Sequence, residues 1–246
     1  MSRLRVSLSA AIFSIFLIGF SPATSSPGQK FPHPHSASST FDLDFSILPD
    51  DVRNHLKSQG FTFEQQMGDE SAIHLSAENG RLNIVTDGPA LGVLVNKDLH
   101  ITHPELLEIA WGVERYPQSA DWQGGRKNEA VMVVLFFGDP LPGAQFYLPD
   151  MPLFLGMFLG DSDPPHKAFA SENYSETGRY VCMENPPAGQ TIVTRLDIRD
   201  AFRDWFGNRA IPPVTGIAIE VDTGDLSGEA VSSSAFIHHI GLIKAD

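Results

Sequence analysis

After Phe41, apolar and polar residues alternate with a period of two along most of the chain. Successive side chains of a β-strand point to opposite faces, so this period predicts strands with one buried face. The predicted strands are Ala72–Ser76, Arg81–Thr86, Ala90–Asn96, Glu105–Arg115, Glu129–Gly138, Pro152–Gly160, Arg179–Met183, Gln190–Ile198, Val214–Thr223 and Ser234–Ile243.

The segment Glu105–Arg115 shows the alternation most clearly. One parity is apolar and is expected to face the core: Leu107, Ile109, Trp111 and Val113. The other parity carries Glu108 and Glu114 and is expected to face outward. In Val214–Thr223 the outward parity carries Glu220 and Asp222. By contrast, Val131–Phe137 is apolar at both parities, which predicts a strand covered on both sides.

Two short helices interrupt this pattern. One is predicted over Asp50–Gln59, with Gly60 after it. The other is predicted over Ile198–Phe206, with Asp197 as N-cap and Gly207 beyond its end. Many short strands, turn-forming dipeptides between them and no internal repeat together predict an all-β fold. We expect a jelly-roll-like β-sandwich of about ten strands with one or two short helices.

The N-terminus has the features of an export signal. Arg3 and Arg5 precede an almost wholly apolar run, Val6–Phe20, which is shorter than a membrane-spanning helix needs. The predicted organisation is a signal peptide over 1–25, a flexible Pro/Ser-rich linker over 26–40 and one β-sandwich domain over 41–246. A periplasmic or secreted protein with no membrane span after signal removal is expected, and an uncleaved anchor is the alternative.

Charge narrows the range of partners. The chain has 246 residues, with 17 Lys and Arg against 30 Asp and Glu. This acidic balance disfavours nucleic acids and anionic membranes, whose phosphates require clustered cations. The single cysteine, Cys182, excludes an internal disulfide framework, and its apolar neighbours predict a buried thiol. No nucleophile-elbow, phosphate-loop or zinc-protease motif is present in the sequence.

Carboxylates form the first group of candidate site residues. If the strands that carry them are neighbours, Glu108, Glu114, Glu220 and Asp222 would gather on one sheet face. The loop beyond adds Asp225 and Glu229, so that Asp222, Asp225 and Glu229 could hold a structural calcium ion. The alternatives are a solvated acidic face and catalysis, for which the pair would be Glu114 and Asp222.

Aromatic and histidine side chains form the second group. Trp122, Tyr116, Tyr174 and Tyr180 fall near predicted turns or in the long loop, where exposed rings stack on sugars. His238 and His239 are adjacent in a strand, so alternation sends them to opposite faces and only one can line a site. The predicted ligand-binding residues are Trp122, Tyr116, Glu108, Glu220 and His239.

Two segments resemble a known family. They are ITHPELLEIAWGVERYPQSADW, followed by NEAVMVVLFFGDP, and a closing unit IRDAFRDWFGNRAIPPVTGIAIEVDTGDLSGEAVSSSAFIHHIGLI. The chain is similar in them to the bacterial exported domain of unknown function numbered 3047. Asn128 and Glu129 replace two aspartates of that family, and Asp222-Thr223-Gly224-Asp225 departs from its acidic loop. The resemblance implies export and a galactose-binding-like jelly roll, without an established reaction.

These features together favour non-catalytic binding of a carbohydrate or a cell-envelope glycan, with calcium as the one cofactor considered. A glycan-cleaving hydrolase or lyase that uses outward-facing carboxylates is the first alternative. A structural partner in an envelope complex is the second. Aromatic rings along a groove would favour binding, and two convergent carboxylates in a cleft would favour the enzyme.

Overall fold

A computed structural model describes residues 39–47, 51–143, 148–224 and 232–243. The chain divides into two units, 1–35 and 36–246, and the described residues belong to the second. The predicted signal peptide over 1–25 and residues 26–38 of the predicted linker lie outside the described residues. Strand β1 begins at Ser39, two residues before the predicted domain boundary.

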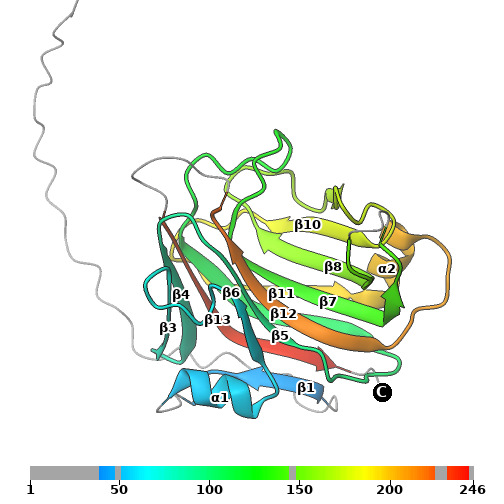
Figure 1. The fold of residues 1–246 in the computed structure, drawn as a ribbon, viewed down its shortest axis with the longest axis horizontal. Helices are drawn as coiled ribbons and strands as arrows, with labels where there is room; N and C mark the ends of the chain where they lie inside the picture. Colours follow the sequence, from blue (N-terminus) through cyan, green and yellow to red (C-terminus); the bar gives the residue numbers. More distant parts are fainter. Residues whose placement is uncertain (1–38, 48–50, 144–147, 225–231, 244–246) are drawn as a thin grey trace, which may run out of the picture. The chain divides into compact units, whose positions relative to one another are not determined.

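Two β-sheets pack face to face (Figure 1). Sheet A has the order β11 (Ile192–Asp197), β6 (Leu106–Arg115), β13 (Ser232–Ile243), β4 (Arg81–Asp87) and β3 (Ile73–Glu78), and β1 (Ser39–Asp44) also pairs with β13. Sheet B has the order β2 (Thr62–Gln65), β5 (Leu91–Asn96), β12 (Val214–Asp222), β7 (Glu129–Leu141), β8 (Met151–Leu159), β10 (Gly178–Glu184) and β9 (Ala168–Ala170). The predicted all-β sandwich with two short helices is confirmed.

The main core lies between the two sheets. It contains the predicted inward parity of β6, including Trp111, whose indole N–H donates to the Thr194 hydroxyl over 2.9 Å. Strand β7 contributes to two apolar clusters, because Val133 and Leu135 face the main core while Met132 and Val134 belong to a second cluster. The expectation that this strand is covered on both sides is therefore confirmed.

All ten predicted strands are present, with ends that shift by three residues or fewer. Three further strands, β1, β2 and β9, were not predicted. Strands β2 and β9 have four and three residues, too few to show an alternation, whereas β1 does alternate, with Phe41 and Leu43 between Asp42 and Asp44. Each instead forms on the edge of a strand that is already in a sheet: β1 on β13, β2 on β5 and β9 on β10.

Both helices form where end signals are strong. Helix α2 (Ile198–Phe206) matches its prediction, and the Asp197 carboxylate accepts from the backbone N–H groups of Arg199 and Asp200. Helix α1 (Val52–Ser58) is capped in the same way by Asp51. These carboxylates satisfy amide groups that the first helical turn leaves unpaired.

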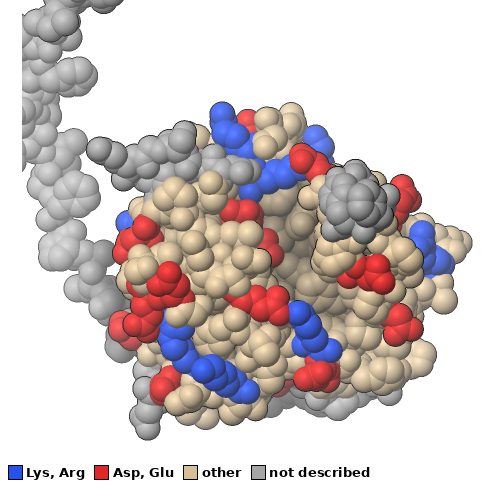
Figure 2. Space-filling model, in the orientation of Figure 1, with Lys and Arg blue, Asp and Glu red and all other residues tan. Residues whose placement is uncertain are grey.

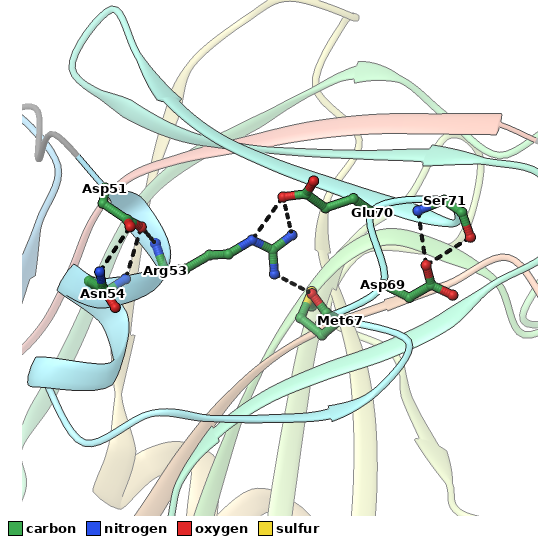
Figure 3. A network of polar contacts seen from close by, with 7 residues as sticks. All are labelled: Asp51, Arg53, Asn54, Met67, Asp69, Glu70 and Ser71. Carbon is green, nitrogen blue, oxygen red and sulfur yellow. Dashed lines mark hydrogen bonds and ion pairs between the residues drawn. The ribbon is translucent and has the colours of Figure 1, made fainter.

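A polar network ties α1 to the β2–β3 connection (Figure 3). Arg53 forms an ion pair with Glu70 at 3.1 Å and donates to the Met67 carbonyl oxygen at 3.4 Å. Next to it, the Ser71 amide and hydroxyl both donate to Asp69, and these two bonds lower the pKa of the Asp69 carboxyl. These contacts tie α1 to the segment that leads into β3.

A β-bulge in β7 changes which residues share a face. On β7, Met132 pairs with Glu220 while Glu129 pairs with Asp222, so three steps on β7 match two on β12. Ala130 and Val131, inside the bulge, both lie in the main core. Because of the bulge, Glu129 and Met132 point to the same side of sheet B although they are three residues apart.

Candidate functional site

The four outward carboxylates do not form one group. Strand β6 is in sheet A and β12 is in sheet B, so the two strands are not neighbours. Glu108 and Glu114 lie on the outer face of sheet A, and Glu220 and Asp222 lie on the outer face of sheet B. The prediction that the two strands are neighbours is thus wrong. Because Glu114 and Asp222 belong to different sheets, they cannot act as a catalytic pair.

On sheet A the carboxylates are held by arginines. Glu108 is buried and accepts from Arg195 over 2.7 Å, and Glu114 forms an ion pair with Arg81 at 2.9 Å. The Arg81 guanidinium also lies 4.2 Å from the Phe236 ring centre. The predicted ligand residue Glu108 therefore has a structural partner.

The two histidines depart from simple alternation. A bulge on β13 inserts His238 between Ile237, opposite Trp111, and His239, opposite Ala110. His238 lies with its ring 5.5 Å from that of Phe236 and its Nδ1 2.9 Å from the Gly80 carbonyl oxygen. The two adjacent histidines therefore lie between the inward-facing Ile237 and Ile240.

His239, a predicted ligand residue, lies on the outer face of sheet A. Its Nε2 is 2.6 Å from an oxygen of Asp42 on β1, and its Nδ1 is 4.0 Å from Glu108. These contacts link β1, β13 and β6. His239 and the pair Glu220 and Asp222 belong to different sheets, so they do not share a face.

Trp122 is buried, contrary to the exposed stacking platform that was expected. It is 4% exposed, stacks on Phe158 with ring centres 4.6 Å apart and donates its indole N–H to the Asn128 carbonyl oxygen. Tyr116 is half-buried and donates to the Pro186 carbonyl oxygen over 2.7 Å. Desolvation, followed by the charge of Asp161, raises the pKa of Tyr116. Both rings therefore pack within the fold and do not form the exposed sugar-stacking surface that was predicted.

Cys182 is buried on the sheet B side of the molecule, as predicted. Its Sγ lies 3.2 Å from Oδ1 of Asn185. Desolvation raises the pKa of the thiol to about 11, so it stays protonated at neutral pH.

Three carboxylates lie on neighbouring strands of sheet B, and we call Glu129, Glu220 and Asp222 the acidic cluster. Glu129 is buried, with 1% of its surface exposed. Asp222 lies directly opposite Glu129, and Glu220 precedes Asp222 by two residues on the same side of β12. Directly opposite residues of an antiparallel pair have Cβ atoms about 4.5–5.5 Å apart. Sequence alternation alone would not place Glu129 here, because the β7 bulge decides its side.

The end of β12 is anchored firmly. Thr223 is fully buried, its hydroxyl donates to the Gly88 carbonyl oxygen over 2.9 Å, and it accepts from the Ala90 amide over 3.0 Å. Gly88 has φ of +108°, which suits a glycine in this turn. One oxygen of Asp222 accepts from the Gly224 amide over 2.7 Å. These bonds fix the backbone from which Asp222 projects.

Tyr180 on β10 reaches toward the acidic cluster across β8. Its register partner is Gly156, where a Cβ atom would stand 2.7 Å from the Tyr180 ring and 2.6 Å from the Met132 sulfur. A side chain at this position would therefore force the Tyr180 ring or the Met132 sulfur to shift. The charges of Glu220, Glu129 and Asp222, which act after desolvation, raise the pKa of the Tyr180 hydroxyl, while a hydrogen bond with Ser171 lowers it.

Glu220 has a strongly perturbed carboxyl group. Desolvation, followed by the charge of Asp222, raises the pKa of Glu220 to about 7. The first cause is the apolar neighbourhood, since its register neighbours on either side are Val93 and Met132. Near neutral pH this carboxyl can therefore either donate or accept a proton.

Aromatic rings lie on the same face of sheet B, on the side toward β8 and β10. Phe154 and Phe158 are buried there, and Tyr180, Tyr174, Phe136 and Phe169 are partly exposed. Figure 2 shows a hollow in the surface where Figure 1 draws β8 and β10, with both acidic and basic side chains beside it. Sequence reasoning named Tyr174 and Tyr180 as candidate stacking rings but missed the phenylalanines Phe154, Phe158 and Phe169, because nothing in the local pattern distinguishes their face from the main core.

Only one of the three predicted calcium ligands, Asp222, lies among the described residues. Asp225 and Glu229 lie outside the described residues. Within the described part of the chain, no group of three His, Cys, Asp or Glu side chains is arranged to hold a metal ion.

A second hollow of about 420 Å³ lies at the opposite end of β7 and β12. Its lining includes Phe137, Leu153, Pro212 and Pro213, with His100 and Asp139 as polar residues. It contains no residue of the predicted site.

The comparisons with solved structures give low similarity. The chain is similar to the carbohydrate recognition domain of Emp46p in its potassium-bound form, with 12% identity, coverage of 86% of this chain and 100% of that chain, and a TM-score of 0.45. It is also similar to a family 12 xyloglucanase from Bacillus licheniformis (9% identity, 85% and 99% coverage, TM-score 0.42). A third similarity is to CBM28, a carbohydrate-binding module specific for non-crystalline cellulose (13% identity, 85% and 97% coverage, TM-score 0.35).

No protein-family model and no curated protein matches the chain, so the resemblance to the numbered domain family stays a prediction. Among the described residues, no helix is both long and apolar enough to cross a membrane.

Proposed function

We propose that this chain is an exported protein that binds a carbohydrate through the outer face of sheet B. One observation carries the proposal: that face has its own aromatic cluster, separate from the main core, around a surface hollow. Flat aromatic faces pack against the apolar faces of sugar rings. Carboxylates beside them can accept hydrogen bonds from sugar hydroxyls.

The partly exposed rings are the proposed contact residues, in place of Trp122. Tyr180 combines a ring on the face with a hydroxyl near the acidic cluster. Trp122 holds Phe158 in place through their stacking contact, and thus supports the face from one side.

A glycan array with the secreted protein tests this proposal, followed by calorimetry on any glycan that binds. Tyr180→Ala is expected to weaken binding at least tenfold, as loss of a stacking and hydrogen-bonding contact does. Tyr116→Phe is the matched control, since that tyrosine lies outside the face, and it should leave binding unchanged. No binding to any glycan on the array would contradict the proposal.

Glycan cleavage is a second candidate function, and the state of Glu220 favours it. A carboxyl with a pKa of about 7, next to Asp222 and diagonal to Glu129, resembles an acid paired with a carboxylate base or nucleophile. Release of reducing ends from a bound glycan, lost in Glu220→Gln while binding persists, would support cleavage. A bound glycan that remains intact after prolonged incubation would leave binding as the function.

Export and calcium are parts of the proposal that rest on sequence alone. N-terminal sequencing of the protein recovered outside the cytoplasm should begin after Ala23 or Ser25. If the loop that contains Asp225 and Glu229 holds calcium, added calcium should raise the melting temperature and a chelator should lower it. A melt that is the same in both conditions removes calcium from the account.

A further inference from the structure

Four aromatic side chains form a diagonal row on the outer face of sheet B, and we call Phe136, Phe154, Tyr180 and Phe169 the aromatic row. Phe136 on β7 lies directly opposite Phe154 on β8, with ring centres 6.2 Å apart. The ring centre of Phe154 lies 5.5 Å from that of Tyr180 on β10. Phe169 on β9 is the register partner of Tyr180. The row therefore crosses four neighbouring strands, from β7 to β9.

Two glycines let the central rings lean across the strands. Gly178 on β10 is the register partner of Phe154, and a Cβ atom on that glycine would overlap the Phe154 ring. Gly156 on β8 is the register partner of Tyr180, and a Cβ atom there would stand 2.7 Å from the Tyr180 ring. Each ring thus lies over the strand from which the other projects. Side chains at these two positions would displace the rings, so the glycines keep the row continuous.

The length of the row exceeds that of one sugar ring. Adjacent strands of a sheet are about 4.8 Å apart, so the spacings from β7 to β9 span about 14 Å. Phe136, Tyr180 and Phe169 are partly exposed along this length, and Phe154 is buried between them. A ligand can therefore contact rings at both ends of the row and near its middle. Strand β9 is the last strand of sheet B, so the row reaches the edge of the sheet, where a long chain can continue past it.

Polar groups beside the row pair with one another. Lys127 forms an ion pair with Glu172 at 2.6 Å, and Lys167 donates to the Gln123 amide oxygen over 3.0 Å. The Lys167 ammonium also lies 5.4 Å from the centre of the Phe169 ring, which places it at the β9 end of the row. An acidic glycan would have to displace Glu172 to reach Lys127. Sugar hydroxyls can exchange hydrogen bonds with these groups as they stand, because a hydroxyl both donates and accepts.

Carboxylates on the neighbouring strand also disfavour an acidic ligand. Glu220 and Asp222 lie on β12, which is next to β7 in sheet B. Desolvation first, and then charges that include those of Glu220 and Asp222, raise the pKa of the Tyr180 hydroxyl. A carboxylate or sulfate of a glycan near this ring would be repelled by the same charges. The surroundings of the row therefore favour an uncharged ligand.

We propose that the aromatic row binds an uncharged glycan along its chain, with at least three consecutive sugar units packed across β7, β8, β10 and β9. This inference rests on the proposed carbohydrate-binding function and adds the class of the ligand: a stretch of an uncharged polysaccharide chain. It excludes single sugars, polyuronates and sulfated glycans as the preferred ligands. Each further unit that reaches a ring adds a stacking contact, so affinity increases with chain length until the row is filled.

Calorimetry with oligosaccharides of increasing length tests the inference. The probes are chains of one, two, four and six units of β-1,4-linked glucose and of β-1,4-linked N-acetylglucosamine, because both are uncharged and unbranched. For at least one of these sugars, affinity should rise about tenfold or more between two and four units and change little between four and six. A galacturonate hexamer, in which every unit carries a carboxylate, should bind at least about tenfold more weakly than the neutral hexamer of that sugar.

Variants at the two ends of the row locate the contact. Phe136→Leu and Phe169→Leu each remove a flat ring and keep an apolar side chain. Each should weaken binding of the neutral hexamer about fivefold or more, with a smaller effect on the two-unit chain, which fits on the middle of the row. Phe63→Leu on β2, at the opposite edge of sheet B, is the matched control and should leave both affinities unchanged. Urea denaturation checks that each variant is folded.

The outcomes separate the two proposals. Equal affinity for the two-unit and six-unit chains would overturn the inference and leave carbohydrate binding intact. The same holds for a galacturonate hexamer that binds as tightly as the neutral hexamer, and for an array glycan that binds while neither neutral series does. A loss in Phe63→Leu equal to that in Phe169→Leu would also overturn it, by placing the contact outside the row. If no oligosaccharide and no array glycan binds, the carbohydrate-binding function itself fails.

Discussion

The outer faces of the two sheets treat their carboxylates differently. On sheet A, Glu108 and Glu114 each meet an arginine, at 2.7 and 2.9 Å. On sheet B, Glu220 has another carboxylate, Asp222, as its main charged neighbour, and its pKa rises to about 7. The same residue type at the same strand parity is thus neutralised on one face and left under repulsion on the other.

This difference separates a structural face from a candidate functional one. An arginine–carboxylate pair completes itself and needs no ligand. A cluster of carboxyl groups in apolar surroundings lowers the stability of the chain, and such strained electrostatics concentrate at functional sites. We therefore assign binding to the face that carries the unfavourably placed Glu220.

The largest effect is expected from loss of the tryptophan that covers sheet B. Trp122→Ala removes a buried ring that contacts Phe158, Phe169 and Tyr180. The cavity should lower the free energy of unfolding by about 3–5 kcal/mol. Urea denaturation measures this change, and a loss below about 1 kcal/mol would show that the outer cluster is not a packed core.

The next prediction gives opposite signs for one substitution on the two faces. The unfolded chain ionises Glu220 near its ordinary value of 4.5, whereas the folded chain does so at about 7. Between these pH values only the unfolded state loses the proton, so stability falls as pH rises through this window and stays low above it. Glu220→Gln removes this loss.

Glu220→Gln should therefore unfold at a free energy higher than wild type by about 2–3 kcal/mol at pH 8, with little difference at pH 4. Glu108→Gln should instead be less stable than wild type at pH 8, because it weakens the contact with Arg195. Denaturation of both variants at the two pH values checks the comparison. The same sign for both would mean that the faces do not differ electrostatically.

A smaller effect is expected where Tyr180 crosses β8. In Gly156→Ala the new methyl group would meet the Met132 sulfur and the Tyr180 ring, so one of them must move. The expected loss of stability is about 1–3 kcal/mol, typical of overpacking. Near-UV circular dichroism should change together with stability. An unaltered aromatic spectrum would show that the ring does not lie over Gly156.

The smallest effect belongs to sheet A. Arg195→Met takes away the cation from Glu108, but the Arg195 side chain is 59% exposed and solvent already screens the pair. We expect a loss of about 1 kcal/mol or less, and less still at high salt. A loss of several kcal/mol, measured by urea denaturation, would show that the pair is effectively buried.

Local pattern predicted much of this architecture and little of the site. The inward parity of β6, the cap of α2 by Asp197 and the covered strand at Val131–Phe137 follow from residues adjacent in sequence. Trp122 was misjudged because its flanking polar residues and glycines are typical of an exposed turn. Its burial depends on Phe158, which follows 36 positions later and reaches it only through the fold.

By itself, the sequence determined which segments are extended, which helices start and stop, and which side of each strand is apolar, because these depend on neighbours within a few residues. The tertiary structure decided which carboxylates share a surface. Asp222 meets Glu129 across the sheet rather than Glu114, and Glu129 faces outward only because of a bulge. Strand partners and bulges depend on packing between residues far apart in sequence, and alternation along one strand carries no information about either.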